Sequence, residues 1–166
     1  MTNRLLPTAR PILLMALIWA VAVSTPLLAS ELVVTRYFSG LWDQPRQENQ
    51  GVVLQIVDTD PERKNAVAYW FTYGDDTVSG QRWLTAQGGF AGSTAAIDIY
   101  ETTGGLFDDP HPVDVSPVGT MTIDFADCSN AQLSYTLSDQ GLGGDMEISQ
   151  LISNAQGMCE ELAGAQ

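Results

Sequence analysis

The chain has 166 residues, of which 7 are Lys or Arg and 20 are Asp or Glu, so its formal net charge is −13 at pH 7. This balance argues against nucleic acid as a partner, because phosphate backbones are bound by clustered Lys and Arg, and only Arg63 and Lys64 are adjacent basic residues here. A single histidine and two cysteines support a zinc site poorly, and the sequence has no phosphate-binding loop or dinucleotide fingerprint. We therefore expect neither a metal nor a cofactor.

Residues 1–30 have the composition of an export signal. They include Arg4 and Arg10 but no acidic residue, and an apolar run extends over 12–23. Small or turn-prone residues follow, so we expect cleavage between Ser24 and Glu31, with an uncleaved membrane anchor as the alternative. Cleavage would leave one exported domain, 31–166, in the periplasm or outside the cell, without membrane attachment and long enough for a single core.

The exported part consists of short apolar segments separated by turn residues, without long helical periodicity. This spacing predicts antiparallel β structure. We expect eight strands, at 33–42, 51–58, 65–73, 81–88, 95–102, 120–125, 132–137 and 145–152. The proline-rich stretch 104–118 is predicted to be a loop that crosses an end of the sheet, and 153–163 could hold a short helix.

Alternation within the predicted strands gives most of them one apolar and one polar face. In 120–125, for example, Met121 and Ile123 alternate with Thr122 and Asp124. The segment 65–73 is apolar on both faces, which indicates a central strand or a contact surface. An all-β, eight-stranded antiparallel meander is thus expected. We prefer a closed barrel because it removes exposed strand edges, and a two-sheet sandwich fits the same pattern.

Two cysteines in an exported chain usually form one disulfide. A bond between Cys128 and Cys159 would close a loop of about 30 residues and contribute roughly 3 to 4 kcal/mol. It would tie the C-terminal tail to the turn that follows Phe125. A pair of free thiols is the alternative.

Several short motifs are distributed over 38–151. They are Ser39, Gly40, Leu41 and Trp42; Trp70, Phe71, Thr72 and Tyr73 with Trp83; Tyr100, Thr102, Thr103, Gly104, Gly105 and Phe107; and Val118, Gly119 and Thr120 with Phe125, Asp127 and Cys128. Together they resemble a group of exported bacterial β domains of largely unassigned function. That group often has Gly-His-Gly before the second strand, where this chain has Asn49, Gln50 and Gly51. The early Gly-x-Trp motif and the strand count are also loosely similar to avidin-like and lipocalin-like barrels, which bind small ligands at an open end.

The candidate ligand-binding residues are aromatic: Trp42, Trp70, Tyr73 and Trp83. A hairpin that joins Trp70 to Trp83 could bring these rings onto one surface, and large rings with polar tips suit a small apolar ligand, a sugar face or a protein groove. The alternative is that the rings belong to the core. Arg82 is interpreted as a surface charge on the opposite face from Trp83.

Acidic residues offer a second hypothesis. Asp98, Asp124 and Glu147 lie within predicted strands and could supply the two carboxylates of a glycosidase. Acidic pairs in turns, such as Asp58 with Asp60, do not match a calcium loop and are read as solvated. His111 lies between two prolines, and no serine-nucleophile motif occurs. We therefore expect a non-enzymatic binding or interaction module for a small molecule, a glycan or a protein, with a carboxylate-dependent glycoside hydrolase of the cell envelope as the alternative.

Overall fold

The computed structural model describes residues 32–60, 63–74, 80–151 and 155–163, and the predicted export signal lies outside this part of the chain. The described residues form one 3-10 helix, eight strands and one α-helix. In chain order they are η1 (Arg36–Phe38), β1 (Gly40–Asp43), β2 (Gly51–Asp60), β3 (Arg63–Tyr73), β4 (Gln81–Ala91), β5 (Thr94–Leu106), β6 (Asp109–Phe125), β7 (Asn130–Leu137), β8 (Leu142–Gln150) and α1 (Gln156–Ala163).

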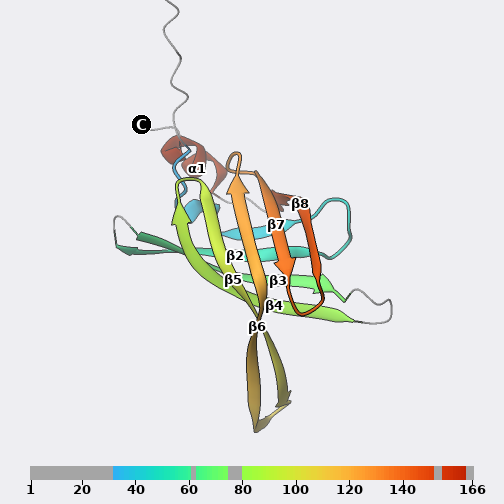
Figure 1. Ribbon diagram of the computed structural model, residues 1–166. Coiled ribbons are helices and arrows are strands. Elements are labelled where there is room, and N and C mark those ends of the chain that lie inside the picture. Colours follow the sequence, from blue (N-terminus) through green and yellow to red (C-terminus); the bar gives the residue numbers. More distant parts are fainter. Residues whose placement is uncertain (1–31, 61–62, 75–79, 152–154, 164–166) are drawn as a thin grey trace, which may run out of the picture.

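Each strand pairs antiparallel with the next, and the last strand returns to the first (Figure 1). The closing seam is short: Trp42 pairs with Gln150 and Asp43 with Ser149. A further backbone hydrogen bond of 2.8 Å, from the N–H of Leu151 to the carbonyl of Leu41, extends it. The sheet is therefore a closed barrel, which confirms the predicted eight-stranded antiparallel meander and excludes the two-sheet sandwich.

The barrel interior is filled by the apolar side chains that alternation places on the inner faces. Its largest members are Trp42 and Trp70, each 1% exposed, and Phe38 from η1 packs edge-on against Phe125 with ring centroids 5.1 Å apart. Side chains alone can fill the interior of an eight-stranded barrel. The inner face of β3 accordingly carries the small residues Ala66 and Ala68 beside Trp70.

One end of the barrel is closed by η1 and α1 (Figure 1). The Cys128–Cys159 disulfide joins the β6–β7 turn to α1, which confirms the predicted pairing. The helix expected within 153–163 is present as α1. In the described parts of the chain, no helix combines the length and apolar character needed to cross a bilayer.

Two sequence expectations about strand bounds are wrong. The first strand, expected at 33–42, is limited to Gly40–Asp43, because the chain first forms η1, whose N-terminus is capped by the hydroxyl of Thr35. The predicted crossing loop 104–118 is instead a hairpin made by the ends of β5 and β6. Its prolines are tolerated because a two-stranded ribbon has free edges that need no N–H donor.

Candidate functional site

The aromatic residues predicted to share one surface lie on opposite faces of the barrel wall. Trp42 and Trp70 are 1% exposed and belong to the core, whereas Tyr73 is 38% and Trp83 59% exposed on the outside. The register of β3 and β4 pairs Phe71 with Trp83, so Trp83 lies on the face opposite to Trp70. The expectation of one common surface is therefore wrong, and Trp42 and Trp70 have the packing role given as the alternative.

The outer face of β3 and β4 carries a continuous group of exposed rings, formed by Tyr69, Phe71, Tyr73 and Trp83. We refer to these residues as the aromatic platform. Phe71 and Trp83 are direct cross-strand neighbours, while Tyr69 and Tyr73 flank Phe71 at spacings of two residues on the same face. Exposed Leu41 on β1 lies beside half-buried Val53 of β2, which pairs with Tyr69. Contiguous exposed apolar surface of this kind marks interaction sites.

A pocket adjoins the platform at the barrel end opposite α1. It has a volume of about 330 Å³ and lies between the β1–β2 loop and the ends of β3 and β4. The residues that line it are Asn49, Phe71, Thr72, Tyr73, Gln81, Arg82 and Trp83. Tyr73 is held against the loop because its hydroxyl donates a 3.0 Å hydrogen bond to the carbonyl of Glu48. We refer to this cavity as the mouth pocket.

Arg82 belongs to a charged group at the mouth pocket and is not the surface charge that the sequence suggested. Its side chain is 10% exposed and makes a bidentate pair with Glu101, with N–O distances of 2.9 and 3.0 Å. Asp139, from the β7–β8 turn, contacts the same guanidinium at 3.1 Å. The hydrogen bonds with Glu101 raise the pKa of Arg82 above its ordinary value, outweighing the opposing effect of burial. The second terminal nitrogen, Nη1, is buried without a hydrogen-bond partner among the described residues.

The interior of this barrel end is polar, in contrast to the apolar core below it. Thr72 and Gln50 are both buried, and the Thr72 hydroxyl donates a 2.9 Å hydrogen bond to Oε1 of Gln50. The amide nitrogen of Gln50 donates in turn to the side-chain oxygen of Gln44. The mouth pocket is therefore bordered by aromatic rings outside and by amide and hydroxyl groups inside.

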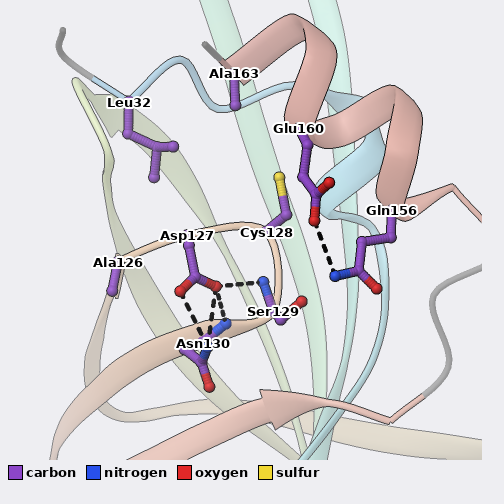
Figure 2. A pocket seen from close by; sticks show the side chains of 9 residues that line it. All are labelled: Leu32, Ala126, Asp127, Cys128, Ser129, Asn130, Gln156, Glu160 and Ala163. Carbon is purple, nitrogen blue, oxygen red and sulfur yellow. Dashed lines mark hydrogen bonds between the residues drawn. The ribbon is translucent and has the colours of Figure 1, made fainter.

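A second cavity, of about 620 Å³, lies between α1 and the β6–β7 turn (Figure 2). Asp127 lines it and accepts hydrogen bonds from the backbone N–H groups of Ser129 and Asn130, at 2.7 and 2.8 Å, and from the Asn130 side chain. Partial burial alone would raise the pKa of Asp127, but these hydrogen bonds outweigh it and lower that pKa below its ordinary value. The hydrogen bonds of the Asp127 carboxylate are thus made within the β6–β7 turn. No aromatic ring lines this cavity.

The three strand carboxylates predicted for a glycosidase all lie exposed on the outer, convex face of the barrel. Asp124 and Glu147 both flank Gln132 of β7 from opposite sides, which separates them by two strand spacings, roughly 10 Å. Asp98 lies four residues along the ladder from Asp124, roughly 13 Å away. Asp124 accepts hydrogen bonds from Thr94 and Ser93, and Glu147 pairs with Arg46 at 3.4 Å. The structure does not bring these acids together in a cleft.

Metal-ligating groups are likewise dispersed. Within 32–60, 63–74, 80–151 and 155–163, no three His, Cys, Asp or Glu side chains are grouped so that they could hold a metal ion. His111 lies exposed on β6.

Comparison with known protein families, with curated proteins and with solved structures finds no match to this chain. The resemblance to exported bacterial β domains therefore stays a prediction.

Sequence reasoning overlooked Phe71 and the pairing of Arg82. Alternation in 65–73 already places Phe71 with Tyr73 on the face opposite to Trp70, so Phe71 could have been included among the candidate residues. The contacts of Arg82 with Glu101 and Asp139 link β4 to β5 and to the β7–β8 turn at one barrel end, so only the closed topology reveals them.

Proposed function

We propose that this protein is an exported, non-enzymatic binding module that holds a neutral saccharide on the aromatic platform, with one sugar unit in the mouth pocket. The observation that carries the proposal is the exposed Phe71–Trp83 cross-strand pair at the edge of a cavity lined by amide and hydroxyl side chains. Side chains that present flat rings next to polar groups suit a ligand whose rings are apolar on their faces and polar at their edges.

The charges around the pocket favour an uncharged ligand. Arg82 is already paired with two carboxylates, Glu101 and Asp139, so the group as a whole is not cationic. An anionic ligand would also be repelled by a chain of net charge −13. A sugar hydroxyl or carbonyl oxygen could instead accept the unused hydrogen bond of Arg82 Nη1, which otherwise stays buried and unpaired among the described groups.

The amide side chains of Asn49 and Gln81 supply donors and acceptors on two sides of the same cavity. Their positions on the β1–β2 loop and at the start of β4 would allow hydrogen bonds to the ring edge while Phe71 and Trp83 contact its face. Export to the periplasm or the medium would bring such a module into contact with envelope or extracellular glycans. The glycoside hydrolase alternative draws no support from the separated positions of Asp98, Asp124 and Glu147.

The test is calorimetric titration of the protein with a panel of neutral oligosaccharides, namely β-1,4-glucan, chitin and α-1,4-glucan fragments. We expect at least one of them to bind, and Trp83→Ala or Phe71→Ala to weaken that binding about tenfold or more, because burying a large apolar side chain contributes roughly 1.5 to 3 kcal/mol and 1.4 kcal/mol corresponds to a factor of about ten. Phe107→Ala is the control, since it truncates a fully exposed phenylalanine ring that lies outside the platform, in the turn between β5 and β6. Absence of binding across the panel, or equal affinities for all variants, would refute the proposal.

A further inference from the structure

The ends of β5 and β6 form a ribbon that extends from the barrel on the side opposite α1 (Figure 1). Its pairs run from Glu101 with Ser116 to Leu106 with Asp109. Pairing of β5 with β4 ends at Tyr100, and pairing of β6 with β7 ends at Gly119, so beyond these points the two strands pair only with each other. We refer to residues 101–117 as the arm.

The arm exposes several large apolar side chains to solvent. Phe107, at the turn, is fully exposed, and Leu106 beside it is 59% exposed. Val113 and Val115 lie opposite Gly104 and Thr102 on one face of the ribbon, and both valines are more than half exposed. An isolated hairpin is marginally stable in water, so an exposed apolar face and tip on such a ribbon suit a partner that covers them.

The edges of the arm are poorly suited to the addition of another strand. Pro110 and Pro112 lack the N–H group through which the β6 edge could pair. On β5, Gly104 and Gly105 have φ values of +82° and +78°, and the ladder shifts register between Gly104 and Leu106. Recognition through backbone pairing is thereby disfavoured, and the exposed side chains are left as the means of contact.

The charge of the arm identifies the kind of partner. Around the apolar residues lie Asp108, Asp109 and Asp114, and 101–117 contains no Lys or Arg. A second copy of this chain, which carries a net charge of −13, would be repelled, and so would an anionic bilayer surface. A protein with an apolar socket rimmed by Lys and Arg complements both features of the arm.

We propose that the arm is a docking element for a basic exported protein, with Phe107 inserted into an apolar socket of that partner and Val113 and Val115 covered by its rim. The proposed contact residues, Phe107, Val113 and Val115, belong neither to the platform nor to the lining of the mouth pocket, so the contact can be tested separately from saccharide binding.

The proposal is tested in the full-length protein by placing the photo-crosslinker p-benzoylphenylalanine at position 107 and irradiating cells of the producing organism. The adduct is identified by mass spectrometry, and the captured protein is purified and titrated against the wild type, Phe107→Ala and Val113→Asp. Phe71→Ala is the matched control, with the same class of ring removed from the platform.

We expect an adduct with a protein of basic surface, and a Kd that rises at least tenfold for Phe107→Ala, as for a central aromatic anchor. The Kd should also rise with ionic strength between 50 mM and 500 mM salt, because the flanking contacts are between charges at the rim. Phe71→Ala should bind the partner as the wild type does. An adduct with a second copy or with lipid, no adduct, or an unchanged Kd for Phe107→Ala would overturn the proposal.

Discussion

The two core tryptophans provide a matched pair of substitutions, because they differ in one hydrogen bond. Trp42 and Trp70 are each 1% exposed, and each has one close aromatic neighbour, Phe125 at 5.3 Å and Tyr135 at 4.9 Å between ring centroids. The indole N–H of Trp42 donates to the carbonyl of Phe38 at 3.0 Å. The indole N–H of Trp70 is buried without a partner among the described residues.

Replacing either indole by phenylalanine removes a similar volume from the core, which costs about 1 to 2 kcal/mol as a partial cavity. Trp42→Phe also leaves the Phe38 carbonyl without this donor, at a further cost of about 1 to 3 kcal/mol. Trp70→Phe instead removes an unpaired buried donor, which offsets about 1 to 2 kcal/mol of its cavity cost. We therefore expect Trp42→Phe to destabilise the fold by about 3 kcal/mol and Trp70→Phe to leave its stability nearly unchanged.

The assay is urea unfolding followed by far-ultraviolet circular dichroism, which does not depend on indole emission. Equal m-values would show that both variants unfold from equally compact native states, so that the difference in midpoint reports stability alone. Equal losses of stability in the two variants, or a larger loss for Trp70→Phe, would refute the assignment of a stabilising role to the Trp42–Phe38 hydrogen bond.

Two further predictions concern the closed end of the barrel. The double variant Cys128→Ser, Cys159→Ser is expected to lose roughly 3 to 4 kcal/mol in urea unfolding, because the bond closes a loop with a sequence separation of 31; a loss below about 1 kcal/mol would contradict this. Asp127→Ala is expected to cost about 1 kcal/mol at pH 7 through loss of the turn hydrogen bonds. Folding lowers the pKa of Asp127. The stabilising effect of the ionised carboxylate is therefore present above the unfolded-state pKa and is lost as pH falls through the lower folded-state pKa. The melting temperatures of Asp127→Ala and the wild type should accordingly converge in strong acid. A difference in melting temperature that persists below the folded-state pKa of Asp127 would contradict a stabilising role for its ionised carboxylate.

Hydrophobic alternation and turn spacing were sufficient to predict the strand number and the antiparallel order. The closed sheet was preferred over a sandwich because closure removes exposed strand edges, and alternation alone does not distinguish the two. The strand prediction failed at 104–118, because Pro110, Pro112 and Pro117 are typical of loops and exclude a central strand. Beyond the barrel, however, β6 has a free edge where a missing N–H costs nothing. The local sequence does not show that β5 and β6 extend beyond the neighbouring strands, because this depends on where β4 and β7 end.

The site was predicted only in part, because β3 is apolar on both faces. Rings at Tyr69, Phe71 and Tyr73 look more suitable for a core than Ala66 and Ala68, yet the structure has the alanines inside. The reason is volume: a closed eight-stranded interior that already holds Trp42 and Trp70 has little space for further rings. The bulkier face of β3 is therefore outside, where it forms the aromatic platform.

The most direct test of the saccharide-binding account is the tryptophan emission of the wild type and of Trp83→Phe during titration with the oligosaccharide that binds most tightly. Trp83 is 59% exposed on the platform, whereas Trp42 and Trp70 are enclosed. We predict that ligand shifts the wild-type emission to shorter wavelength as Trp83 is covered, and that Trp83→Phe shows no shift. A shift that persists in Trp83→Phe would place the ligand near an enclosed indole and contradict the platform as the binding surface.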